Sequence, residues 1–200
     1  MIEWIASSGK SGYNKGIMNN NNEAQSVIID QILKYGRQIL CSEAFRAAWS
    51  ETHHLKGILA DHILNVTIMG CRLCREMNRH KPKVNEGEVI LACLCHDLGM
   101  TGRETIYKSR LASWREHPQE SVRRAKAILP DLDDTVTAAI ESHMWPIAGP
   151  APHTPEGRVV LMADKIASGI DWFSFMKREP WEPRIKERLK DVSLHRAHGQ

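Results

Sequence analysis

Apolar side chains recur at helical spacing along most of the chain. In residues 24–41 and again in residues 55–77 they follow the i, i+3, i+4 pattern that gathers them on one face of an α-helix. No stretch of useful length alternates apolar and polar residues as a half-buried β-strand does, and the sequence has no internal repeat. The pattern therefore predicts an all-α domain built from several helices.

Helix-start signals predict where further helices lie. Asn85 followed by Glu88 resembles a capping box and starts a helix that runs to His96. Pro118 is typical of a first helical position, and Thr154 is expected to cap a helix that begins directly after it. More helices are expected over residues 131–143 and in the basic segment RIKERLKD.

The helix after Thr154 is expected to bury one apolar stripe. Asp164 lies beside this stripe, because it shares a face with Val160 and Ala167, four residues before it and three after. The pattern therefore directs a carboxylate towards the interior. The predicted core positions of the stripe are Val159, Met162, Ala163, Ile166, Ile170 and Phe173.

Three other helices also direct ionisable side chains inwards. These side chains are His62, the adjacent pair His96 and Asp97, and His143. A hydrogen-bonded core histidine would explain any one of them, and Asp164 could pair with a neighbouring cation. Burying several such groups without a shared partner is costly, whereas one metal site would explain them together. Imidazole and carboxylate ligands leave Mn, Fe, Co, Ni, Zn and Mg open as the bound ion.

The composition is that of one soluble domain. The 200 residues are 42% apolar and 26% charged, and the net charge of +3 is too small to favour nucleic acid as a partner. Residues 1–22 are polar and rich in Gly and Asn, so we expect a flexible leader before a single helical domain over residues 23–200. No apolar run reaches the roughly 20 residues of a membrane span, and no signal-peptide pattern is seen. We therefore expect a cytoplasmic protein without membrane contact, and the sequence leaves its oligomeric state open.

The five cysteines fit a reducing compartment, because their number is odd and they form no disulfide-like framework. Cys71 and Cys74 form a C-x-x-C, and Cys93 and Cys95 lie close before His96. However, Cys93 and Cys95 are two residues apart on a predicted helix, so they point to different sides. The spacing favours buried thiols over a zinc site.

The order of the inward-facing residues resembles the HD-domain superfamily of metal-dependent phosphohydrolases. Dinuclear members of this family follow the order H…HD…H…H…D. The segments HHLKGILADHILNV, CHDLG, HMWP and MADKIAS are similar to an HDIG-like branch, over a core region of about residues 50–176. The matching positions are His62, His96, Asp97, His117, His143 and Asp164.

The resemblance implies a compact helical bundle that holds two divalent metal ions. The first ion would bind His62, the HD pair and Asp164, and Asp97 would bridge to a second ion on His117 and His143. The GYP signature of cyclic-dinucleotide phosphodiesterases does not follow His117, so that activity is not expected.

The implied reaction is hydrolysis of a small phosphate ester, with a nucleotide as one candidate, by a metal-activated water. Asp97 and His96 are assigned to catalysis, and His54, Lys165 and Arg103 to substrate contact. Two alternatives stay open. The same ligand set resembles HD-domain di-iron oxygenases, and a non-catalytic domain that binds a metal or a nucleotide would need the same buried residues.

Overall fold

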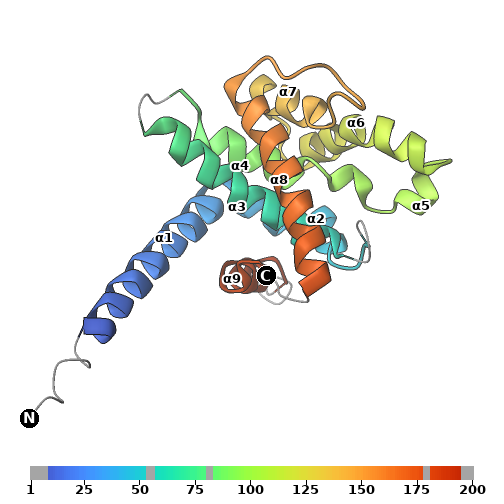
Figure 1. Ribbon diagram of the computed structural model, residues 1–200. Coiled ribbons are helices and arrows are strands. Elements are labelled where there is room, and N and C mark those ends of the chain that lie inside the picture. The colour runs from blue at the N-terminus through green and yellow to red at the C-terminus, as the bar shows by residue number, and fades with distance from the viewer. Residues whose placement is uncertain (1–8, 53–56, 80–82, 178–180, 195–200) are drawn as a thin grey trace, which may run out of the picture.

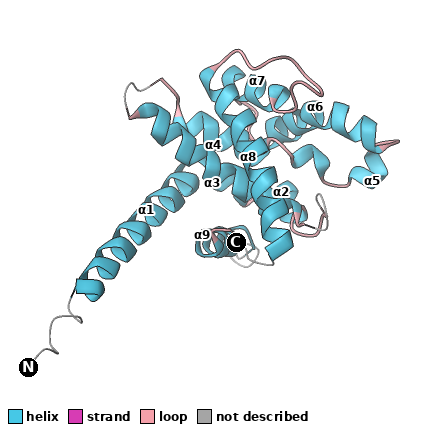
Figure 2. Cartoon of the chain, in the orientation of Figure 1, coloured by secondary structure: helices cyan, strands magenta, loops and turns pink. Residues whose placement is uncertain are grey.

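The computed structural model describes residues 9–52, 57–79, 83–177 and 181–194. Within these ranges the regular structure is helical apart from one isolated β-bridge between Thr52 and Ile58, which confirms the predicted all-α class (Figure 2). The elements are α1 (Gly9–Leu40), α2 (Glu43–Ala47), α3 (Leu59–Asn78), α4 (Glu86–Cys95), the 3-10 turn η2 (Leu98–Met100), α5 (Arg103–Ile106), α6 (Arg110–Ile128), α7 (Asp134–Ser142), α8 (Pro155–Lys177) and α9 (Pro183–Leu194).

The bundle is organised around α4, the most apolar helix. Helix α3 packs against α4 and α8, while α7 packs against α4, α6 and α8. Figure 1 shows α8 crossing the front of the body, and the N-terminal part of α1 projecting away from it. The buried core includes Ile63 of α3, Leu94 of α4 and Ile140 of α7. This packing brings the C-terminal ends of α4 and α7 close to α8.

Two predicted helix starts are confirmed by their caps. The Asn85 side chain accepts hydrogen bonds from the backbone N–H groups of Gly87 and Glu88 and donates to the Glu88 carboxylate, while the Asn85 backbone N–H donates to Glu156. The Thr154 hydroxyl accepts from the backbone N–H of Gly157, and α8 begins at Pro155. These caps fix where the two helices that carry the HD pair and Asp164 begin.

Three predicted boundaries are corrected. Residues 9–22 of the expected leader belong to α1, so this helix starts before residue 23, and residues 1–8 of that leader lie outside the described residues. Pro118 lies inside α6, because that helix begins eight residues earlier, directly after Ser109, whose hydroxyl caps it by accepting from the Ala112 N–H. Helix α7 begins at Asp134, because the Asp133 side chain accepts from the Thr135 N–H and sets the start.

The predicted core stripe of α8 is wrong in part. Val159 and Ala163 are buried as expected, but Met162, Ile166 and Phe173 are exposed. The buried face of α8 is the one that carries Asp164, and it includes only part of the predicted stripe. With this face the helix packs on α3, α4 and α7. Helix α8 carries apolar side chains on two faces, and only one of these faces packs against other helices in the described structure.

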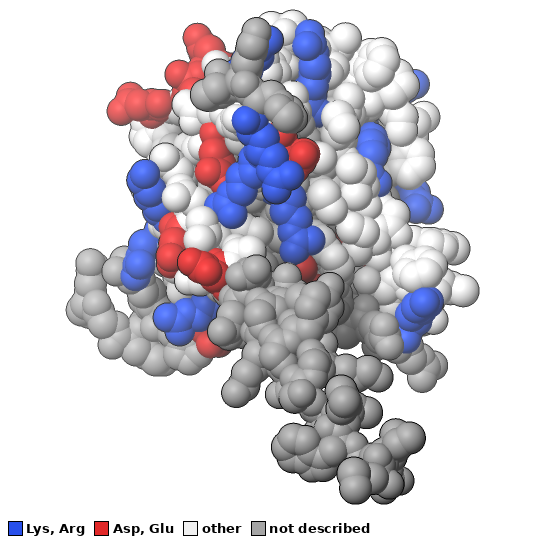
Figure 3. All heavy atoms as spheres, turned by 60° about the vertical axis from the view of Figure 1, so that its left-hand side comes forward, with Lys and Arg blue, Asp and Glu red and all other residues white. Residues whose placement is uncertain are grey.

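Charges of both signs are interspersed on the face shown in Figure 3. A cleft is lined by Arg72, Arg75 and Arg79. Each of these arginines forms an ion pair with a glutamate. Among the helices that the structure describes, none combines the length and apolar character of a membrane span.

Candidate metal centre

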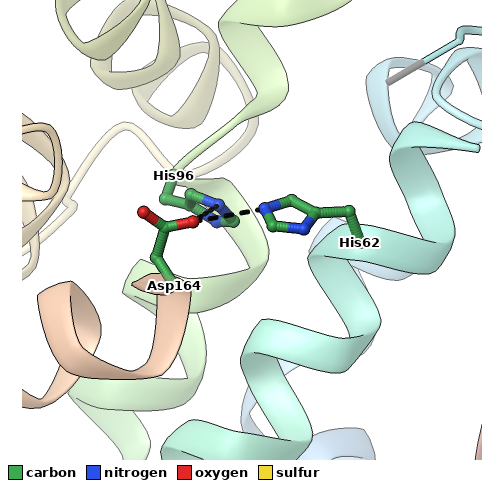
Figure 4. A group of neighbouring side chains, drawn as sticks. All are labelled: His62, His96 and Asp164. Atoms are coloured by element: carbon green, nitrogen blue, oxygen red, sulfur yellow. Dashed lines mark ion pairs between the residues drawn. The ribbon is translucent and has the colours of Figure 1, made fainter. Parts of the chain in front are cut away.

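Three ligand-type side chains from three helices meet inside the bundle (Figure 4). His62 lies in the first turn of α3, His96 is the C-cap of α4, and Asp164 belongs to α8. The Oδ1 atom of Asp164 is 3.3 Å from Nε2 of His62 and 4.0 Å from Nε2 of His96. All three residues are buried, and one ligand atom of each lies within 4.8 Å of the other two. We call them the first ligand group.

Asp97, His117 and His143 form the second ligand group. Asp97 lies between α4 and η2, His117 belongs to α6, and His143 is the C-cap of α7. The Nε2 atoms of the two histidines are 3.0 Å apart, and one ligand atom of each residue lies within 4.8 Å of the other two. The structure therefore brings together all six positions that the family resemblance singled out.

The Asp97 carboxylate faces both groups. Its Oδ1 atom lies 3.1 Å from Nε2 of His117 and 3.5 Å from Nε2 of His143. Its Oδ2 atom lies 3.6 Å from Nε2 of His96 and 3.8 Å from Nε2 of His62. A carboxylate placed in this way can bridge two ions of a dinuclear site.

Gly99 allows the HD turn to approach α6. A Cβ atom at this position would lie 2.4 Å from the carbonyl oxygen of His117 and 2.8 Å from the backbone nitrogen of Ser121. The Gly99 N–H donates to the Ser121 hydroxyl at 2.9 Å, which holds η2 against the helix. The glycine after the HD pair therefore has a packing reason, and this contact sets Asp97 beside His117.

The second nitrogen of each histidine ring is held by an acceptor. Nδ1 of His96, His117 and His143 lies 2.7, 2.8 and 2.6 Å from a backbone carbonyl oxygen. A carbonyl only accepts, so each Nδ1 carries the proton, and in the neutral ring the Nε2 lone pair points into the centre. Metal-binding histidines are commonly oriented in this way.

His62 is oriented by a carboxylate, Asp171, which sequence reasoning missed. Nδ1 of His62 lies 2.6 Å from Oδ2 of Asp171, and the Asn65 amide donates to Oδ1 at 2.5 Å. Asp171 follows Asp164 by seven residues, or two turns of α8, so both carboxylates share one face of that helix. This spacing is the signal that could have identified Asp171.

The first ligand group is electrostatically prepared for a cation. Burial lowers the pKa of His62, but the carboxylates of Asp164 and Asp171 outweigh it and raise the pKa to about 10. Burial raises the pKa of Asp164, yet the nearby His62 imidazole holds it well below its ordinary value. Burial lowers the pKa of His96 to about 4, against the charge of Asp97, so this imidazole is neutral and can donate its lone pair.

The residues fit a divalent metal ion. The buried Nε2 atom of His96 has no hydrogen-bond partner within the described part of the chain. Such an orphaned nitrogen costs free energy, which a bound cation would remove. The donor set of imidazole nitrogens and carboxylate oxygens suits Mn, Fe, Co, Ni and Zn without selecting among them.

The cysteines take no part in either ligand group. Cys71, Cys74, Cys93 and Cys95 are buried free thiols of the core. Burial raises the pKa of Cys95 to about 12 and that of Cys74 to about 11, with nearby glutamates adding to the effect at Cys74. These thiols are protonated and behave as small apolar side chains, which agrees with their predicted role.

A cavity of about 150 Å³ opens onto both ligand groups. Lys165 lines it, with Nζ 2.7 Å from Oδ2 of Asp164. Arg103 does not belong to the residues that line this cavity, so its role in substrate contact stays a prediction, and His54 lies outside the described residues. The apolar part of the wall is formed by Met100, Trp114, Met144 and Ile147.

The family model for the HD domain matches residues 59–169. The match covers more than half of the 200 residues and includes all six residues of the two ligand groups. The chain therefore belongs to the HD domain family, a superfamily of metal-dependent phosphohydrolases. The match does not separate the HDIG-like branch from the others. No curated protein and no solved structure matches the chain.

Proposed function

We propose that this HD domain binds two divalent ions and hydrolyses a small phosphate ester. The observation that carries the proposal is the division of the Asp97 carboxylate between the two ligand groups, because it joins them into one centre. Ions bound there would supply Lewis acidity for the phosphoryl oxygens and a water of lowered pKa as nucleophile.

The side chains around the ions have separate tasks. Asp97 keeps the two groups together, and His96 offers a neutral Nε2 because its Nδ1 donates to the Cys93 carbonyl. Lys165 holds Asp164 at the mouth of the cavity, and its side chain is 46% exposed. We assign Lys165 to a phosphoryl oxygen of the substrate, since its ammonium group can turn from the carboxylate to a bound phosphate.

The cavity size supports entry of the phosphoryl end alone. Its volume is about 150 Å³. This space is enough for ions and a phosphoryl group but too small for a nucleoside as well. The leaving group would lie outside, against the apolar wall that includes Trp114.

The test is metal-dependent phosphate release. Apo-protein is reloaded separately with Mn, Fe(II), Co, Ni, Zn or Mg and assayed with p-nitrophenyl phosphate and nucleoside monophosphates. We expect release with at least one ion, loss of release in Asp97→Ala, and retention in Asp61→Ala, whose carboxylate pairs with Lys186 outside both ligand groups. Metal binding without turnover on any substrate would make the domain non-catalytic. Dioxygen consumption by the iron-loaded form alone would favour the oxygenase.

A further inference from the structure

Helix α8 has an exposed apolar face opposite its buried face. Asp164 and Asp171 point to the interior, whereas Met162, Ile166, Phe173 and Met176 follow each other at helical spacing on the outer side. Their exposed fractions are 49%, 39%, 59% and 65%, and Trp172 beside them is 52% exposed. A helix with apolar side chains on two faces is expected to be covered on both of them.

Gly169 lies in the middle of this outer face. A Cβ atom there would meet nothing within 4 Å, whereas one at Gly70 would meet the Cys93 sulfur at 2.8 Å. Glycine inside a helix is less stable than alanine, and nothing in the described chain requires it at this position. A second helix that approaches α8 closely would require it, because small residues let two backbones come together.

Four of the five exposed apolar positions on this face are arranged symmetrically about Gly169. Met162 and Met176 lie seven residues to either side of it. Ile166 and Trp172 lie three residues to either side. Two antiparallel copies of α8 that cross at Gly169 would therefore place Met162 opposite Met176, and Ile166 opposite Trp172. A two-fold interface needs such a self-complementary surface.

Charge does not oppose this pairing. The same register sets Lys165 opposite Phe173 and Lys177 opposite Leu161, so no like charges face each other. A groove that includes Ile166, Gly169 and Phe173 of this face is also lined by Ile170 and Trp181. The surface thus offers apolar contact without like-charge repulsion, and the Lys165 ammonium pairs with Asp164 of its own chain.

We propose that α8 is the interface of a homodimer, with the two-fold axis at Gly169. Five large apolar side chains that are about half exposed offer roughly 500 Å² per copy. Two copies would then bury about 1,000 Å², which is the lower bound for a specific interface. The dimer would place the outer faces of both α8 helices together and leave each inner face on its own ligand groups.

Sedimentation velocity of the full chain at about 1 to 100 µM tests the proposal. We expect a dimer for the native sequence and for the control Leu111→Lys, which changes an exposed leucine of α6. Phe173→Lys and Gly169→Leu should each weaken association at least tenfold, and Gly169→Leu should not lower the Tm of the monomer. A native chain that stays monomeric at 100 µM, or a dimer that survives both α8 variants, would overturn the proposal.

Cross-linking tests the register. In a Cys41→Ser background, an equal mixture of Met162→Cys and Met176→Cys chains should form disulfide-linked dimers under mild oxidation. Neither chain alone should do so, because the offset of fourteen positions between 162 and 176 separates like cysteines by about 21 Å along the helix. Equal cross-linking of each variant with itself would contradict an axis at Gly169.

Discussion

The two ligand groups share Asp97 but differ in charge. The first group combines two imidazoles with the Asp164 carboxylate and one oxygen of Asp97, and Asp171 stands behind His62. The second group has two imidazoles and only the other oxygen of Asp97. More anionic ligand charge generally means tighter binding of a divalent cation. We therefore expect the first group to hold its ion firmly and the second to exchange its ion.

Asp97→Ala should have the largest effect, because it removes a ligand from both groups at once. Loss of several kcal/mol of Lewis-acid stabilisation corresponds to a fall in kcat/KM of about 1,000-fold. Elemental analysis should show metal lost along with activity, while Asp61→Ala keeps both. An Asp97→Ala protein with full metal content would show that this carboxylate is not a ligand.

Asp164→Ala and His143→Ala should have different effects on the metal content, because each removes a ligand from one group only. His143→Ala removes a ligand of the second group only, so about one ion per chain should remain after gel filtration. Asp164→Ala removes the charge that distinguishes the first group, so the firmly held ion should be lost. If both variants retained the same metal content and affinity, the two groups would be equivalent and the comparison would fail.

Asp171→Asn should weaken metal binding by the first ligand group. The substitution keeps the shape of the side chain but weakens the acceptor that orients His62. Loss of such an orienting partner costs about 10- to 100-fold in metal affinity. Competition with a chelator of known affinity measures this change, and the second group should respond less. Unchanged affinity would assign Asp171 to helix packing.

Arg124→Met should have the smallest effect on the centre. Arg124 donates to the Leu98 and Thr101 carbonyls and to Glu120, and thereby ties the HD turn to α6. Its loss leaves two carbonyls without this donor, so we expect destabilisation by about 1–3 kcal/mol in urea unfolding. Metal occupancy of the second ligand group should fall more than that of the first. Arg124 joins the HD turn to α6, and this contact positions Asp97 relative to His117.

The ion pairs of Glu120 with Arg123 and Arg124 predict that the stability of the fold depends on pH. A hydrogen bond from Arg123, partly opposed by burial, and a second from Arg124 lower the pKa of Glu120 from 4.5 to about 2. A lowered folded-state pKa stabilises the fold above pH 4.5, and this contribution is lost as the pH falls towards 2. Glu120→Gln should therefore destabilise the protein at pH 7 but not near pH 2. A difference that persists near pH 2 would exclude this cause.

The six positions of the two ligand groups could be predicted from the sequence, because charged residues on apolar faces are rare and the order of the family motif is specific. Helical period alone placed His62 and Asp164 on inward faces. It could not show how the Asp97 oxygens divide between two groups, since that depends on the tertiary contact of Gly99 with α6. Asp171 was missed because its role depends on α3 and α8 lying side by side.

On the outer face of α8 the sequence pattern predicted burial that the structure does not show. Apolar spacing predicted that Met162, Ile166 and Phe173 belong to the core, but the pattern reports that a surface is apolar, not what covers it. The extent of α1 was missed for a different reason. Residues 9–22 carry glycines and asparagines that lower helix propensity, yet they continue the helix that packs further along.

Titration of the apo-protein with Mn(II), followed by electron paramagnetic resonance, is the most direct test of whether Asp97 bridges two metal ions. The first equivalent should give the signal of an isolated ion in the first group. The second should give an exchange-coupled spectrum, because a carboxylate bridge holds two ions about 3.5–4 Å apart. Asp97→Ala should abolish the coupling. Two uncoupled signals, or no tight binding at all, would contradict a dinuclear centre bridged by Asp97.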